Sequence, residues 1–147
     1  MNRFLPTLCL FSVLAFGICT ADMTVWKGKV DSDGTPTPTV KLLLGKRYQI
    51  KASGTMNLGK FRQAGLPLAD DACFEFNDKV TPKITHGLQN SIGISVCDGH
   101  YHPDHRYQSI PFKAIQSGVH FWIYDTDYND NHGNLEVEVI QLNDEEQ

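Results

Sequence analysis

Three things are scarce or missing in this 147-residue sequence, and each excludes a class of protein. Positive charge is scarce: 13 Lys and Arg stand against 17 Asp and Glu, for a formal net charge of -4, whereas sequence-independent binding of nucleic acid requires clustered cations. No stretch has a sustained helical period of apolar residues, which argues against a helical bundle. No nucleophile elbow or Ser-His-Asp arrangement is present, so we do not expect an enzyme.

The N-terminal segment has the features of a secretory signal peptide. A short basic start precedes a mostly apolar stretch over residues 4–16, and small side chains at Cys19 and Ala21 suit cleavage by signal peptidase. The apolar run is shorter than the ~20 residues that a membrane-spanning helix needs. We therefore predict a signal peptide over residues 1–21, no membrane span, and a secreted or periplasmic protein.

The chain that remains after cleavage has only two cysteines, Cys73 and Cys97. Because two thiols in an oxidising compartment are more often paired than free, we predict a disulfide between them. This mature chain carries 12 Lys and Arg against 17 Asp and Glu, a formal charge of -5. We expect one domain over residues 22–142, followed by an acidic tail at residues 143–147.

Short alternating apolar stretches, separated by turn residues, make up most of this domain. The alternation is clearest at residues 119–123 and 135–139, where every second side chain is apolar, as expected for strands with one buried face. Further candidate strands lie at residues 24–30, 40–44, 47–52, 74–76, 92–96 and 110–115. About eight short strands in one domain predict an all-β fold, either a β-sandwich or a small barrel.

The connection between the last two predicted strands is rich in oxygen. Residues 125–134 carry six carboxylate or amide side chains, many more than a hairpin of two to five loop residues needs. The carboxylates of Asp125, Asp127 and Asp130 would repel one another unless a cation lay between them. Ca²⁺ prefers mixed carboxylate, amide and carbonyl oxygens, so we predict a calcium site, with an unliganded polar turn as the alternative.

Three motifs of the chain also carry a family resemblance. They are the Trp-Lys-Gly sequence at residues 26–28, the run Trp-Ile-Tyr at residues 122–124 that leads into the acidic loop, and Asp-Asn-His-Gly at residues 130–133. On these motifs the chain resembles the calcium-dependent, galactose-binding bacterial lectins of the PA-IL type, known as LecA. The resemblance implies a jelly-roll-like β-sandwich in which one Ca²⁺ bridges the protein and a galactoside. Since single sites of this kind bind weakly, we also expect a homo-oligomer.

The resemblance assigns roles to five residues. Asp125 would be the chelating carboxylate, and Asp127 would contribute its backbone carbonyl. Asp130 and Asn131 would replace two adjacent Asn side chains of the family, and Leu58 would contribute a remote backbone carbonyl. Asp125, Asp130 and Asn131 would also form hydrogen bonds with the sugar. Because the loop is two residues shorter than in the family, Asp127 remains an alternative to Asp125 as the chelating carboxylate.

The sugar-contacting loop of the family has a different counterpart here. The family carries a His-Pro-Asp-Gln stretch in its first long loop, whereas residues 59–71 of this chain contain no His. A His-Pro-Asp triplet occurs later, at residues 102–104. We therefore predict that Tyr101 and His102, in the loop that carries this triplet, contact the sugar. The sequence does not determine whether the sugar is galactose.

Residues 100–105 allow another interpretation. They spell H-x-H-x-D-H, the zinc-binding pattern of the metallo-β-lactamase superfamily. The chain is too short for that fold and lacks its helices, so a small zinc hydrolase is the weaker alternative. A surface zinc or copper site formed by His100, His102 and His105 is a second alternative. A third is a calcium-stabilised adhesion domain without a sugar ligand.

Overall fold

The computed structural model describes residues 21–59 and 68–143. The predicted signal peptide and acidic tail therefore lie almost entirely outside the described residues. All regular secondary structure in the described part is β, as predicted, and no helix there is long and apolar enough to cross a membrane. The strands in chain order are β1 (Met23–Asp31), β2 (Val40–Lys41), β3 (Arg47–Ser53), β4 (Met56–Asn57), β5 (Ala69–Asp70), β6 (Phe74–Asn77), β7 (Val80–Ile84), β8 (Leu88–Asn90), β9 (Arg106–Gln108), β10 (Phe112–Lys113), β11 (Gly118–Val119), β12 (Phe121–Ile123) and β13 (His132–Gln141).

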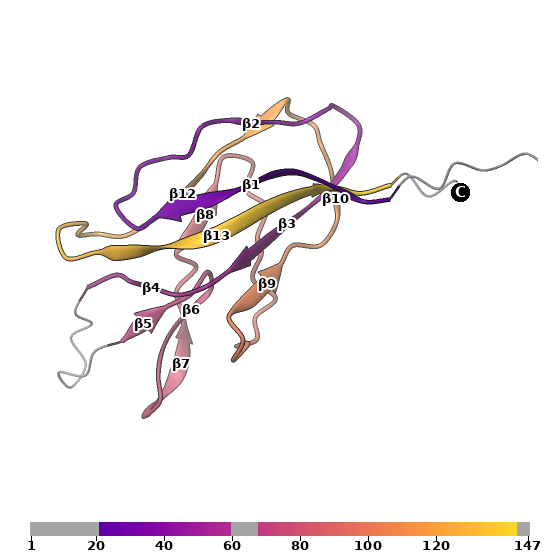
Figure 1. Cartoon of the computed structure of the whole chain (residues 1–147). Coiled ribbons are helices and arrows are strands. Elements are labelled where there is room, and N and C mark those ends of the chain that lie inside the picture. Colours follow the sequence, from indigo (N-terminus) through magenta and orange to yellow (C-terminus); the bar gives the residue numbers. More distant parts are fainter. Residues whose placement is uncertain (1–20, 60–67, 144–147) are drawn as a thin grey trace, which may run out of the picture.

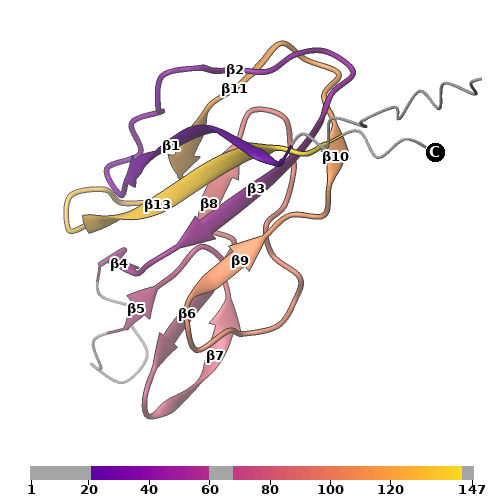
Figure 2. The same ribbon diagram turned by 45° about the vertical axis from the view of Figure 1, so that its right-hand side comes forward.

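The strands form a β-sandwich with one large antiparallel layer. In this layer the long strand β13 lies between β1 and β3 (Figure 1). β3 also pairs with β9 and β10, and the first residues of β13 pair with β4, from which the sheet continues through β5 and β6 to β7. Two short pairs, β2 with β11 and β8 with β12, complete the fold, and Figure 2 shows β8 behind β13 and β3.

The core lies between these layers, and the alternation predicted for the last strand is confirmed. Leu135, Val137 and Val139 of β13 are fully buried, whereas Glu136 between them is exposed. They pack in one cluster with the buried side chains of β3 and β12, and the ring of Trp26 in β1 stacks on that of Phe121 in β12 at a centroid distance of 5.6 Å. Apolar burial of this kind stabilises the sandwich.

Residues 92–96 do not form the predicted strand. Instead, the side chain of Asn90 forms hydrogen bonds with the backbone groups of this segment. Its Oδ1 accepts the N–H groups of Ile92 and Ile94, and its Nδ2 donates to the carbonyl of Ile94 at 2.6 Å. An amide side chain that satisfies backbone groups locally competes with strand pairing. β8 takes the place beside β12, immediately before this segment.

Three strands lie in segments that the sequence predicts to be loops: β4 and β5 within residues 54–71, and β9 within residues 98–108. β9 forms within the polar segment before residue 109, because Tyr107 is buried while its neighbours Arg106 and Gln108 are exposed. β4 lies in the segment over residues 54–71 and pairs with β13 through Met56 and Asn57. This pairing positions the end of β4 beside the loop before β13.

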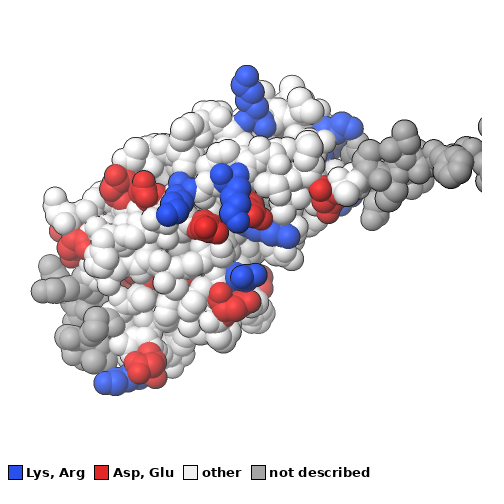
Figure 3. Space-filling view, viewed as in Figure 1, with Lys and Arg blue, Asp and Glu red and all other residues white. Residues whose placement is uncertain are grey.

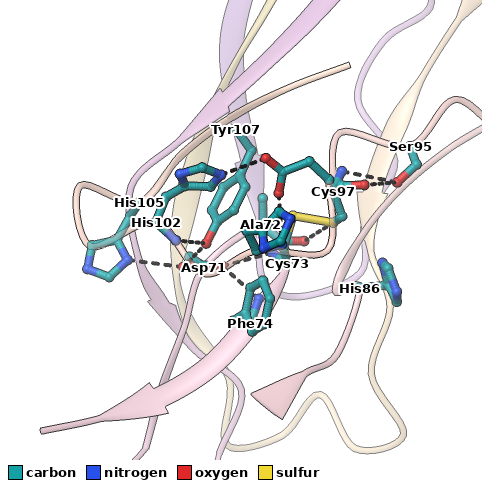
Figure 4. Close-up of a disulfide and its surroundings, with 12 residues drawn as sticks. Asp71, Ala72, Cys73, Phe74, His86, Ser95, Cys97, His102, His105 and Tyr107 are labelled. Atoms are coloured by element: carbon teal, nitrogen blue, oxygen red, sulfur yellow. Dashed lines mark hydrogen bonds and ion pairs between the residues drawn. A yellow bond between two sulfur atoms is a disulfide. The ribbon is translucent and has the colours of Figure 1, made fainter. Parts of the chain in front are cut away.

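The predicted disulfide is confirmed. Cys73 and Cys97 are joined, with their Cα atoms 5.6 Å apart. The bond links the residue before β6 to the segment that leads into the histidine-containing loop (Figure 4). A cross-link that closes a loop of this size contributes about 3 kcal/mol to stability in the chain-entropy account.

Candidate functional site

The loop at residues 124–131 connects β12 to β13 and is anchored by Tyr128. The hydroxyl of Tyr128 accepts the N–H of Asp125 at 3.1 Å and donates to the carbonyl of Ile123 at 3.2 Å. Its ring lies against Gly34, whose φ of 81° and missing side chain permit this close approach. The side-chain amide of Asn131 donates to the carbonyl of Ser32 at 2.9 Å. The turn after β1 therefore holds the loop in place through its contacts with Tyr128 and Asn131.

Two oxygen atoms of this loop are buried without a hydrogen-bond partner. They are Oδ2 of Asp125 and Oδ1 of Asn131, two of the three such side-chain atoms among the described residues. A buried polar atom without a partner costs free energy, and an unseen water or ion is one explanation for such an atom in a folded protein. Both residues belong to the predicted calcium ligands. Their unpaired oxygens fit a hard cation, which binds carboxylate and amide oxygens.

The structure brings two more of the predicted residues to this end of the sandwich. The carboxylate of Asp130 lies directly against Gly59, where a Cβ atom would overlap it. Leu58 precedes Gly59 and follows β4, whose Asn57 pairs with His132 at the start of β13. Leu58 and Asp130, 72 positions apart in the sequence, are therefore neighbours through the pairing of β4 with β13.

Asp127 differs from Asp125 in its contacts. Its Oδ1 accepts both the backbone N–H of Asn129 at 3.1 Å and the side-chain amide of the same residue at 2.8 Å. The Asp127 side chain thus shapes the loop as an Asx turn and is exposed. Asp125 uses only Oδ1, which accepts the N–H of Thr126 at 2.6 Å. Of the two carboxylates, only that of Asp125 keeps a buried oxygen without a partner.

Asp70, a buried carboxylate beside this site, was not predicted from the sequence. Its Oδ2 accepts the N–H of Leu58 at 3.3 Å. Burial raises the pKa of Asp70 to about 7; the hydrogen bond from Leu58 opposes the shift, and the negative charges of Glu75 and Asp125 add to it. Asp70 lies in a segment without visible periodicity, and only the paired acids before Cys73 mark it in the sequence.

The pKa of Asp70 has a consequence for stability. Because this pKa rises from 3.8 to about 7 on folding, the folded chain holds the proton more strongly than the unfolded chain between these pH values. The free energy of unfolding therefore falls as the pH rises through this interval, by at most about 1.4 kcal/mol per pH unit from this group. Urea unfolding in chelator at pH 5 and pH 7 should show a smaller fall for Asp70→Asn than for the wild type. Equal falls in the two proteins would contradict this.

The carboxylates of the loop at residues 124–131 are not sufficient by themselves to hold a metal ion. Within residues 21–59 and 68–143, no three His, Cys, Asp or Glu side chains are placed together so that they could hold a metal ion. A cation at the loop would therefore need the amide oxygen of Asn131 and backbone carbonyls in addition to Asp125 and Asp130. Such a mixed oxygen set suits Ca²⁺ and is unsuited to Zn²⁺, which prefers His and Cys.

The histidines of residues 100–105 do not converge. The Nε2 of His102 lies 2.8 Å from Oδ2 of Asp98, the Nδ1 of His105 lies 3.0 Å from Oδ2 of Asp71, and His100 is exposed. His102 and His105 are therefore each paired with a different carboxylate (Figure 4). This arrangement gives no support to the zinc interpretation of the H-x-H-x-D-H pattern.

Asp71 connects this histidine loop to the disulfide. Its carboxylate is fully buried and accepts the N–H groups of Cys73 and Phe74 on Oδ1, at 2.8 and 2.7 Å. Its Oδ2 accepts the hydroxyl of Tyr107 at 2.9 Å and faces His105 (Figure 4). Burial raises the pKa of Tyr107, so its hydroxyl stays protonated and donates to Asp71.

The two predicted sugar contacts from this loop are engaged with the protein. The ring of Tyr101 packs against those of Phe74 and Phe76, with centroids 5.7 and 5.6 Å apart, and the ring of His102 meets that of Tyr107 at 5.0 Å. The structure groups Tyr101 and His102 with β6 and β9. Their contact with a sugar remains a prediction.

Comparison with known proteins adds one structural likeness. No family of known proteins matches the chain, and no curated protein matches it. A solved structure described as "EclA N-terminal domain; PllA-like lectin" is 21% identical to this chain and covers 80% of it and 97% of its own length, with a TM-score of 0.49. At this degree of similarity, the function has to be inferred from the residues of the chain itself.

Proposed function

We propose that the chain is a calcium-dependent carbohydrate-binding protein, a lectin, and that the loop at residues 124–131 is its site. The observation that carries the proposal is the pair of buried, unpartnered oxygens on Asp125 and Asn131. The carboxylate of Asp130, the residue before Asn131, lies against Gly59, just after β4. Bound Ca²⁺ would supply positive charge and open coordination positions that two neighbouring hydroxyls of a sugar can fill.

We assign some residues of the site to calcium and others to the sugar. Asp125, Asp130 and Asn131 would contribute side-chain oxygens, and Leu58 and Asp127 would contribute backbone carbonyls. Asp130 is exposed and lies at the rim of the loop, so its carboxylate can accept a hydrogen bond from a sugar hydroxyl. Tyr124, which is 61% exposed, adds an apolar ring beside the loop for the face of a sugar.

Galactosides are the proposed ligands, on the resemblance to the LecA-type lectins alone. The disulfide between Cys73 and Cys97 supports a secreted or periplasmic location, where such bonds persist. A homo-oligomer would raise the avidity of a weak, open site. The sugar, the location and the oligomer are separate proposals, and each can fail without the others.

A glycan array with and without chelator tests the function. We expect binding to galactosides in millimolar calcium and its loss in chelator, because the sugar hydroxyls would then have no cation to coordinate. Calcium-dependent melting without any glycan signal would instead support an adhesion domain. Glycan binding that survives in chelator would contradict calcium dependence. As a control for non-specific effects, the array is repeated with Asp33→Asn, a change in the neighbouring turn outside the proposed ligands.

A further inference from the structure

At the end of the sandwich away from the candidate site, three large aliphatic side chains point into solvent. Leu43, Leu44 and Ile115 are 63%, 65% and 87% exposed, respectively, and we call them the aliphatic tip. Single exposed apolar residues are common on proteins, whereas several together mark a surface that contacts a partner or a membrane. None of the three belongs to the proposed sugar site.

The three side chains lie on two neighbouring turns. The turn between β2 and β3 carries Leu43 and Leu44, and the segment between β10 and β11 carries Ile115. Backbone hydrogen bonds join these segments: the N–H of Gly45 donates to the carbonyl of Ala114 at 2.8 Å, and that of Leu42 to the carbonyl of Ser117 at 2.9 Å. The aliphatic tip is therefore one surface.

The strand β13 separates the aliphatic tip from the sugar-site loop. Its first residue, His132, follows the loop, and its last residue, Gln141, pairs with Tyr48 just after the β2–β3 turn. A strand of ten residues spans roughly 30 Å. Figure 1 shows the loop and the β2–β3 turn at opposite ends of the molecule. A partner at the aliphatic tip would therefore leave the loop uncovered.

Basic residues outnumber acidic ones in the two segments that carry the aliphatic tip. One acidic residue, Asp22, lies at the same end of the sandwich, where its Oδ1 accepts the N–H of Asn143 just after β13. Residues 39–50 and 108–118, which form the two turns and their flanks, contain four Lys and Arg and no Asp or Glu, in a chain whose net charge is -4. The side chain of Lys113 passes close to Gly45, with its Cε 3.9 Å from where a Cβ atom would stand. In Figure 3 basic side chains lie along the upper edge over β2 and the turn that follows, and the acidic side chains of this face lie lower. The basic residues are Lys41, Lys46, Arg47 and Lys113.

The shape of the surface and its charge exclude two kinds of occupant. The cavity beside the tip, lined by Leu42, Ile92, Ile94, Phe112 and Ile115 among others, measures only about 100 Å³. Sites for small ligands usually measure about 300–1,000 Å³. A second copy of the chain is disfavoured too, because a two-fold contact would place one basic rim against the other.

We propose that the aliphatic tip docks on an anionic lipid bilayer. Leu43, Leu44 and Ile115 would enter the boundary between headgroups and acyl chains, where apolar side chains are stabilised. The basic residues around them would lie at the level of the anionic headgroups, which attract Lys and Arg near the surface. The sugar-site loop would then face away from the membrane. The proposal is independent of the proposed function, since it uses none of the sugar-site residues.

Sedimentation with vesicles tests the proposal. The signal-free chain is mixed, in chelator, with vesicles of equal parts phosphatidylcholine and phosphatidylglycerol and with vesicles of phosphatidylcholine alone. We expect binding to the first and at least about tenfold weaker binding to the second. Salt should weaken the binding, because it screens the basic rim. No binding to the anionic vesicles, or equal binding to both, would overturn the proposal.

Matched variants assign the binding to this surface. Leu43→Ser with Leu44→Ser and Ile115→Ser should weaken it at least about tenfold, whereas Val80→Ser with Ile84→Ser, at two residues that are each 42% exposed on β7, should not. Lys41→Gln with Lys113→Gln should weaken it more than Lys29→Gln with Lys51→Gln, which changes the net charge equally. If the Ser variants at the tip and on β7 lost equal amounts of binding, or if the two double Gln variants did, the assignment would be overturned.

Full competition by soluble poly-glutamate, with no effect of the Ser variants, would point to an acidic protein partner instead. Because all substituted side chains are exposed, melting temperatures should stay close to that of the wild type.

Discussion

Asp125→Asn should weaken calcium binding by on the order of 100-fold, and sugar binding should fall with it. The variant keeps the size of the side chain and an oxygen that can accept the N–H of Thr126, so the loop should fold normally. It removes the negative charge that the buried Oδ2 would present to a cation. Calorimetric titration with calcium measures the effect directly.

Asp127→Asn is the matched comparison. Asp127 would contribute only its backbone carbonyl, and an Asn side chain can still accept the hydrogen bonds from Asn129 that shape the turn. We expect its calcium affinity to stay within a few-fold of the wild type. If Asp127→Asn abolished binding and Asp125→Asn did not, Asp127 would be the chelating carboxylate, and the role assigned to Asp125 would be wrong.

Asp71→Ala should produce the largest loss of stability, about 3–5 kcal/mol in the free energy of unfolding. The substitution leaves the N–H groups of Cys73 and Phe74 and the hydroxyl of Tyr107 without their acceptor in a buried place. Each buried donor without a partner costs about 1–3 kcal/mol. Urea unfolding with the disulfide intact measures the loss.

Asp104→Ala, in the histidine loop that Asp71 contacts, is the control for Asp71→Ala. Its carboxylate accepts one N–H, that of Arg106 at 3.2 Å, and is exposed to water. We expect it to cost less than about 1 kcal/mol, since water replaces the lost acceptor. A comparable loss in the two variants would contradict the role of Asp71 as the acceptor for three buried donors.

The parts of the fold that depend on local patterns were predictable, and those that depend on pairing between distant segments were not. The alternation of Leu135, Val137 and Val139 reflects the two-residue period of a strand with one buried face, and the structure confirms it. The strands β4 and β5, with two residues each, are too short to show any period. Residues 54–71 therefore read as a loop.

The candidate site shows the same division. The cluster of oxygens at residues 125–131 is local and visible in the sequence, whereas the proposed contribution of Leu58 was suggested only by the family resemblance. Asp70 was missed because it reaches the site through its pairing with Met56, which no local pattern reveals. The spacing of the histidines at residues 100–105 suggested a zinc or copper site as an alternative. In the structure His105 pairs with Asp71, 34 positions earlier, and His102 pairs with Asp98, which the spacing could not reveal.

A crystal structure grown in millimolar calcium tests the central claim most directly. We predict an ion about 2.3–2.6 Å from both Oδ2 of Asp125 and Oδ1 of Asn131, with coordination positions open toward solvent. Density for a bound galactoside should then place two of its hydroxyls in those positions. A structure in which both oxygens are hydrogen-bonded to water or protein, with no ion at the loop, would contradict the account.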